Sequence, residues 1–162
     1  MAKKILIGLL IVLVLIQFIR PTRNESTAMS ANDIEKQYIV PENVKAILGK
    51  ACGDCHSNNT VYPWYAHIQP GAWFINNHIV DGKKHFNLSE FADYEPKKAD
   101  HKLDELVEEL EGHGMPLESY LWLHPDAKLT ETEIKDVVDW ANGIRKEIQT
   151  THPEAFVKKE KE

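Results

Sequence analysis

The expected fold of this chain follows from one stretch, Cys52-Gly53-Asp54-Cys55-His56. It contains the only two cysteines among 162 residues, three positions apart, with a histidine directly after the second. In this C-x-x-C-H spacing each thiol can form a thioether with one vinyl group of a haem, while the histidine reaches the iron from the same side. The stretch predicts one haem c, attached covalently through Cys52 and Cys55, with His56 as an axial iron ligand.

Three other uses of the two cysteines are disfavoured. A thioredoxin-like redox pair belongs in a βαβ setting, and no strand-rich alternation surrounds residues 52–56. A zinc site needs four nitrogen or sulfur ligands, so it would have to recruit a remote histidine. A disulfide across two residues would be strained, because bridged Cα atoms keep a narrow range of distances.

The N-terminal residues 1–20 read as a membrane-targeting segment. Residues 5–19 are apolar apart from one glycine and one glutamine, with Lys3 and Lys4 before them and Arg20 after them. No small-residue cleavage pattern follows the run, which favours an uncleaved anchor over a cleaved signal. The run is shorter than the ~20 residues that a bilayer core needs, although snorkelling basic residues lengthen such a segment.

Attachment of haem to C-x-x-C-H occurs outside the bacterial cytoplasmic membrane. The sequence therefore predicts a single-pass protein whose haem domain faces the periplasm. Residues 21–35 are polar and without periodicity, as in a flexible tether. Residues 151–162 form a charged tail, which leaves residues 36–150 as one small haem-binding domain.

The domain is expected to be all-α, a small cytochrome c-like helical fold wrapped around one haem. Strand signals are almost absent, and apolar residues recur at helical spacing, as in Val44, Ile47, Leu48 and Ala51. The expected helices cover residues 41–51, 70–82, 100–111 and 130–152, and the longest loops are residues 57–69 and 112–128.

Three local signals set the ends of these helices. Proline is suited to the first turn, as at Pro41 and Pro70. Thr130 and Glu133 have the spacing of a capping box, which predicts the start of the last helix. Gly82 stands where a glycine with positive φ would end the second helix.

Met115 is the candidate for the sixth iron ligand. It lies 59 residues after His56, in a predicted loop, and Pro116 directly follows it. A thioether is a soft iron donor, and a proline would hold such a loop in one shape. The main alternative ligand is His78, which lies on a largely apolar predicted helix. The remaining alternatives are another histidine or an iron with no sixth ligand.

Aromatic residues crowd the region between the two ligand candidates. Trp64, Tyr65 and Trp73 are expected to form the wall of the haem crevice, together with Tyr62 and Phe74. An exposed docking surface is the less favoured interpretation.

Charge narrows the classes of partner. The net charge is −6, and no stripe of Lys and Arg with interleaved aromatics is present, so nucleic acid is excluded. An acidic surface fits a basic redox protein and equally fits simple solubility, so it identifies no partner.

A helix that leads into C-x-x-C-H, a downstream Met-Pro loop and a C-terminal amphipathic helix resemble the class I cytochrome c layout. A closer resemblance, over residues 40–145, is to the bacterial haem-binding domain family. It rests on Cys55-His56-Ser57-Asn58-Asn59-Thr60, Tyr62-Pro63-Trp64-Tyr65, Asn77-His78, Asn87-Leu88-Ser89-Glu90-Phe91, Met115-Pro116 and His124-Pro125-Asp126-Ala127. The resemblance implies covalent haem at Cys52 and Cys55 and iron ligation by His56, but neither a sixth ligand nor a substrate. Ordinary class I cytochromes have fewer residues between the first helix and the Met loop, so the insert formed by residues 62–91 departs from that layout.

These observations predict a membrane-anchored periplasmic cytochrome that transfers single electrons, with a redox partner that the sequence does not identify. One alternative is a haem peroxidase or other small-molecule haem enzyme, with His78 or His113 handling protons. Another is a haem-based redox or gas sensor, in which loss of Met115 from the iron reshapes its loop.

Overall fold

The computed structural model describes residues 1–26 and 28–157, and the regular secondary structure in them is helical, with no strand. This confirms the all-α prediction. The elements are α1 (Ala2–Ile16), α2 (Ile34–Gln37), α3 (Glu42–Ala51), α4 (Gly53–His56), η1 (Trp64–His67), α5 (Gly71–His85), η2 (Leu88–Asp93), α6 (Pro96–Glu111), α7 (Glu118–Leu121), η3 (Pro125–Ala127), α8 (Glu131–Thr151) and η4 (Pro153–Phe156).

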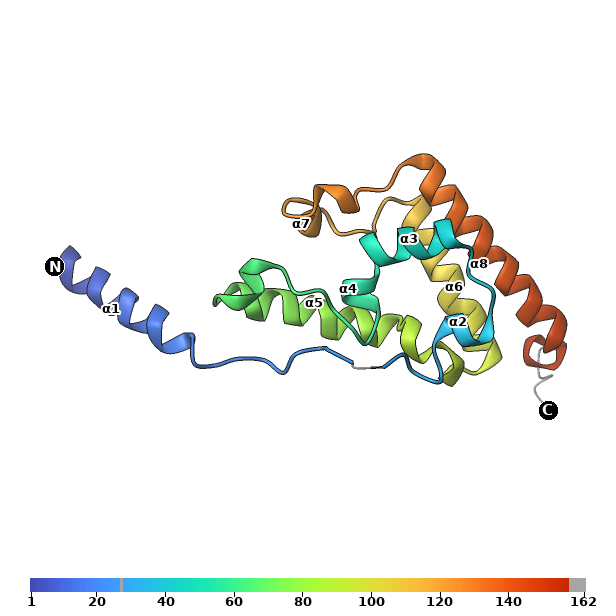
Figure 1. The fold of residues 1–162 in the computed structure, drawn as a ribbon, viewed down its shortest axis with the longest axis horizontal. Helices are drawn as coiled ribbons and strands as arrows, with labels where there is room; N and C mark the ends of the chain where they lie inside the picture. The colour runs from blue at the N-terminus through green and yellow to red at the C-terminus, as the bar shows by residue number, and fades with distance from the viewer. Residues whose placement is uncertain (27, 158–162) are drawn as a thin grey trace.

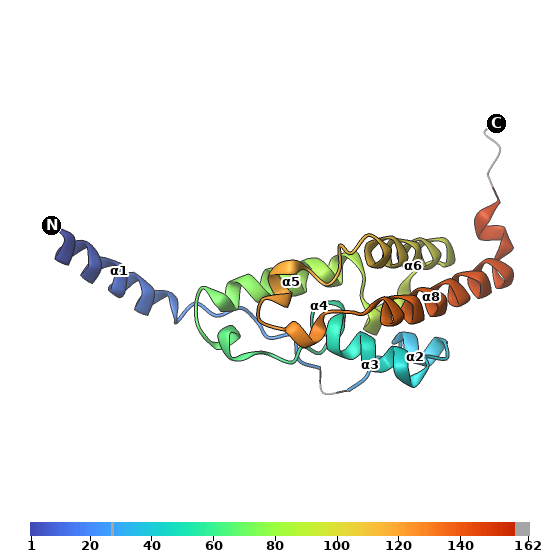
Figure 2. The same cartoon turned by 90° about the horizontal axis from the view of Figure 1, so that it is seen from above.

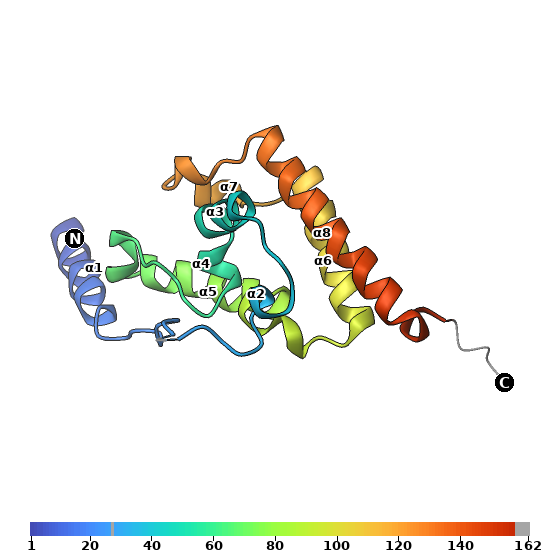
Figure 3. The same ribbon diagram turned by 45° about the vertical axis from the view of Figure 1, so that its right-hand side comes forward.

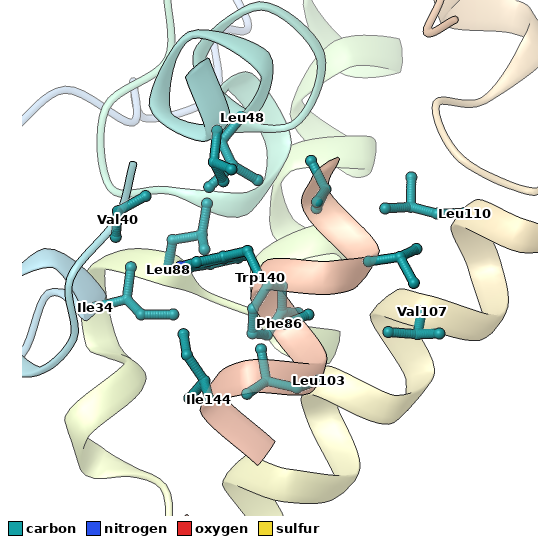
Figure 4. Close-up of a cluster of buried hydrophobic side chains, with 14 of the residues drawn as sticks. Ile34, Val40, Leu48, Phe86, Leu88, Leu103, Val107, Leu110, Trp140 and Ile144 are labelled. Carbon is teal, nitrogen blue, oxygen red and sulfur yellow. The ribbon is translucent and has the colours of Figure 1, made fainter. Parts of the chain in front are cut away.

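The main core lies between the antiparallel helices α6 and α8, with α3 packed against α8 (Figures 1 and 2). The apolar stripe of α6, represented by Leu103 and Leu110, faces the stripe of α8, and both leucines are fully buried (Figure 4). Trp140 is also buried there, and its indole N–H donates to the Ile39 carbonyl oxygen at 3.2 Å. The predicted helical stripes are thus the ones that pack the core.

A second, much smaller apolar cluster lies between η1 and α5. Its buried members are Ala66, Ile75 and Ile79, and Cys55 packs against it. Gly82 was predicted to end this helix, and that prediction is wrong: α5 continues to His85, and none of the described glycines has a positive φ. The glycine is required instead by the close approach of α4, because a Cβ at position 82 would lie 2.7 Å from the Cys55 carbonyl oxygen.

Helix α1 extends away from the body, at the end opposite to the C-terminus (Figures 1 and 3). It contains 15 residues and buries none of them. No helix among the described residues is both long enough and apolar enough to cross a membrane. The predicted spanning anchor over residues 1–20 is therefore not supported, because a span needs ~20 apolar residues.

The segment predicted to be a flexible tether lies along the body rather than free of it. The Asn24 side chain donates to Ser57 O at 2.8 Å and accepts from Lys83 Nζ at 2.6 Å. Further along, Asn32 accepts from the Ala92 backbone N–H at 2.9 Å. The polar side chains of this segment form hydrogen bonds to the body. A polar composition alone does not show whether such side chains contact protein or water.

The C-terminal region contains helical structure that its charge did not indicate. Helix α8 continues to Thr151, and η4 follows it, with Phe156 packed against the main core. The last part of the predicted tail, residues 158–162, lies outside the described residues.

Candidate functional site

The C-x-x-C-H stretch forms a tight corner between α3 and α5. Helix α3 ends at Ala51, and a new turn, α4, begins at once, with the His56 N–H donating to the Cys52 carbonyl at 2.9 Å. Residues at i, i+3 and i+4 share one face of a helical turn, so Cys52, Cys55 and His56 point into the same space. That space is a cavity of about 510 Å³, within the range of ~300–1,000 Å³ usual for small-molecule sites.

His56 is oriented as an iron ligand would be. Its Nδ1 lies 2.9 Å from the Phe86 carbonyl oxygen, which only accepts, so Nδ1 carries the proton and donates. Burial lowers the pKa of His56, which favours the neutral ring. The remaining nitrogen, Nε2, therefore has a free lone pair, and a second-shell carbonyl of this kind commonly fixes the tautomer of a metal-binding histidine.

The two cysteines are half-buried, with thiols in an apolar environment. Burial raises the pKa of Cys52 to about 12 and that of Cys55 to about 11. Redox-active C-x-x-C pairs have a lowered thiol pKa, so the structure does not favour that use of the pair. Within residues 1–26 and 28–157, no group of three His, Cys, Asp or Glu side chains has the geometry to hold a metal ion by itself.

Both candidates for the sixth ligand line the same cavity. Met115 and Pro116 reach it from the segment after α6, and His78 reaches it from α5. The Met115 segment is tied to the end of α6, because the N–H groups of Gly114 and Met115 donate to Glu109 O at 2.8 and 3.3 Å. The His78 ring is held against its own helix, with Nδ1 2.8 Å from Phe74 O.

The expected aromatic wall is only partly present. Tyr65 and Phe74 line the cavity, whereas Trp64 and Trp73 do not. Trp64 lies in η1 with 71 % of its surface exposed. The apolar lining comes mainly from aliphatic residues of the two clusters, represented by Leu48 and Ile75.

Two residues that sequence reasoning missed connect the motif to the Met115 side of the cavity. Tyr120 in α7 donates from its hydroxyl to Asp54 Oδ2 at 2.8 Å, and Asp54 Oδ1 accepts from the Val61 N–H at 2.9 Å. Burial and the Asp54 contact raise the pKa of Tyr120 well above its ordinary value. The tyrosine ring also stacks on His124, with centroids 4.0 Å apart. No local signal could have paired residues that are 66 positions apart.

The cavity and the side chains that line it fit a haem. An apolar cavity of suitable size holds a neutral imidazole with a free Nε2, two unpaired thiols at vinyl-bonding spacing, and thioether and imidazole candidates on other elements.

Comparison with known proteins agrees with this geometry. The family model described as haem-binding domain matches residues 11–143. No curated protein and no solved structure matches the chain. The family match covers most of the 162 residues, including every residue that lines the cavity, and the chain therefore belongs to the haem-binding domain family.

Proposed function

We propose that this protein is a c-type electron carrier with one covalently attached haem. The observation that carries the proposal is that Cys52, Cys55, His56 and Met115 line one cavity. The haem would supply an iron that gains or loses one electron. The protein's part is to hold that iron between two side chains in an apolar site, so that oxidation state changes without a change of ligands.

Each of these residues has a distinct role in the proposal. Cys52 and Cys55 would bind the two vinyl positions of the haem. His56 would be the proximal ligand through Nε2, held in orientation by its bond to Phe86 O. Met115 would supply the second iron ligand from the other side of the cavity lining, and a His/Met pair would raise the reduction potential and leave no coordination position free for small molecules.

The proposal includes attachment to the periplasmic face of the bacterial cytoplasmic membrane. Helix α1 is apolar on all sides and exposed along its length, from Ile5 to Leu15. A helix of this kind is unstable in water unless protein or lipid covers it. The periplasmic side follows from the compartment in which C-x-x-C-H motifs receive haem.

The absorption spectrum of the haem-loaded full chain and of Met115→Ala tests the ligand set. We expect a thioether-to-iron charge-transfer band in the red region of the ferric spectrum, and its loss in Met115→Ala. His78→Ala, which removes the other cavity-lining candidate, is the matched control and should keep the band. The haem should also remain on the denatured chain as a mass increase of one haem.

Two results would contradict the proposal. An unchanged spectrum in Met115→Ala, with a changed one in His78→Ala, would assign the sixth position to His78. Ready binding of carbon monoxide by the native ferrous protein would indicate an open position and favour a haem enzyme or sensor.

A further inference from the structure

The end of the body that faces α1 exposes large apolar side chains. Trp64 and Ile68, in and directly after η1, are 71 % and 53 % exposed. Trp122 and Leu123, directly after α7, are 75 % and 56 % exposed. We call these four residues the apolar end surface. They do not line the haem cavity, so haem binding does not explain them.

These four residues come from two distant segments of the sequence that meet in space. The Tyr65 ring lies 5.8 Å from the His124 ring in an edge-to-face contact, which joins η1 to the residue that precedes η3. Trp64 packs edge-on against Tyr65 at 6.0 Å, and Leu123 directly precedes His124. The two exposed tryptophans of the chain therefore lie on the same end of the body.

The end of α1 is fixed to this same surface. The Gln17 side chain accepts from the Gln69 N–H at 2.9 Å and donates to Gln69 O at 3.3 Å. Gln69 Nε2 in turn donates to Ile19 O at 2.6 Å, although Gln69 is only 1 % exposed. Arg20 donates to His67 O at 2.7 Å. Figures 1 and 3 show η1 and the start of α5 beside the end of α1.

The chain after α1 adds a second attachment. Asn24 contacts three parts of the body: its amide donates to Ser57 O and to Thr60 Oγ1, and its carbonyl oxygen accepts from Lys83 Nζ. Arg23 lies over the Tyr62 ring, 4.0 Å from its centroid. The chain that follows α1 is thus held to the body at Arg23 and Asn24 as well as at Gln17 and Arg20.

From this geometry we infer that the apolar end surface rests in the headgroup region of the bilayer. The inference rests on the proposed membrane attachment of α1. If α1 enters lipid, its fixed junction brings Trp64 and Trp122 to the depth where tryptophan is favoured, between headgroups and acyl chains. Arg20 at the junction would meet lipid phosphates. The domain would then stand on the membrane in one orientation, with its haem at a set distance from the lipid.

Photocrosslinking on the full, haem-loaded chain tests the inference. The photoreactive residue p-benzoylphenylalanine replaces Trp122, Trp64 or, as the control, Ile39, which is 92 % exposed and lies between α2 and α3. Each protein is reconstituted into vesicles of phosphatidylethanolamine and phosphatidylglycerol, and flotation measures membrane attachment before irradiation. We expect a mass increase of one phospholipid at positions 122 and 64 and none at position 39. The haem spectrum checks that each variant is folded.

The outcomes separate the inference from the proposal on which it rests. If all variants float but positions 122 and 64 yield no lipid adduct, α1 attaches to the membrane and the inference is overturned. Adducts between two protein chains at position 122 would overturn it as well, because a second copy would then cover the surface. If the unmodified chain does not float, membrane attachment fails and the inference fails with it.

Discussion

At the scale of single residues, Gly82 is a point of close backbone packing beside the C-x-x-C-H motif. A Cβ there would lie 2.7 Å from the Cys55 carbonyl oxygen, and neither backbone can move without shifting the motif. Gly82→Ala is therefore expected to lower the free energy of unfolding by about 1–3 kcal/mol, as overpacking does. Urea unfolding of the haem-loaded protein measures the change.

Gly143 provides the matched control for that substitution. It lies inside α8, and a Cβ there would meet no atom within 4 Å. Gly143→Ala should stabilise the protein by about 0.5–1 kcal/mol, because alanine loses less backbone entropy in a helix. If the two substitutions had the same effect, close packing of α5 on α4 would not be the reason for Gly82.

The residues that the sequence placed together, and that the structure also brings together, are those with a local signature. The C-x-x-C-H spacing was enough to place Cys52, Cys55 and His56 beside one another. The Asp54–Tyr120 bond and the buried Gln69 had no such signature, because each depends on partners about fifty or more positions away. Trp64 was predicted in the crevice wall from its residue type alone, and burial of an aromatic side chain depends on tertiary packing.

At the scale of elements, the N-terminal cap of α8 also makes a contact with α3. Thr130 and Glu133 form the predicted capping box, and Glu133 also accepts from Lys50 Nζ at 2.5 Å. The Lys50 contact, followed by the Thr130 backbone, lowers the pKa of Glu133 below its ordinary value of 4.5. A lowered carboxyl pKa stabilises the folded state above the ordinary pKa, and this stabilisation is lost as pH falls through the lowered value.

Acid unfolding should therefore depend on Glu133. We expect the free energy of unfolding of the wild type to fall more steeply below pH 4.5 than that of Glu133→Gln. Glu131→Gln, which removes a largely exposed carboxylate from the same turn, should keep the wild-type slope. Equal slopes in wild type and Glu133→Gln would mean that the Lys50 pair does not contribute.

Helices of three or more turns were predictable, and one-turn helices were not. The stripes of α3, α6 and α8 repeat often enough to define a face. By contrast, α2, α4 and α7 have four residues each. Such short helices do not form alone in water. Fixing the backbone of the first turn costs more conformational free energy than its one hydrogen bond contributes. They exist here because tertiary contacts hold them, as the Asp54 bond holds α7 through Tyr120.

At the scale of the whole molecule, the cavity separates two apolar clusters of unequal size. Leu48, Phe86 and Leu110 line it from the main core, and Ile75 lines it from the small cluster of η1 and α5. Among the residues that the structure describes, the small cluster has three buried members. A haem in the cavity would cover apolar surface on both sides, and each Å² removed from water contributes about 25 cal/mol.

Loss of haem should consequently destabilise the part of the body formed by η1 and α5 more than the part formed by α6 and α8. In Cys52→Ala/Cys55→Ala, which cannot form the thioethers and is prepared free of haem, we expect the amides of α5 and η1 to lose hydrogen-exchange protection, while those of α6 and α8 keep most of theirs. The α6–α8 pair has its own continuous core, whereas α5 packs mainly on η1 and α4. Haem-loaded wild type measured alongside provides the reference. A uniform loss of protection across α5, α6 and α8 would mean that the molecule folds as one cooperative unit around its haem, and an unchanged pattern would mean that the small cluster is stable without it.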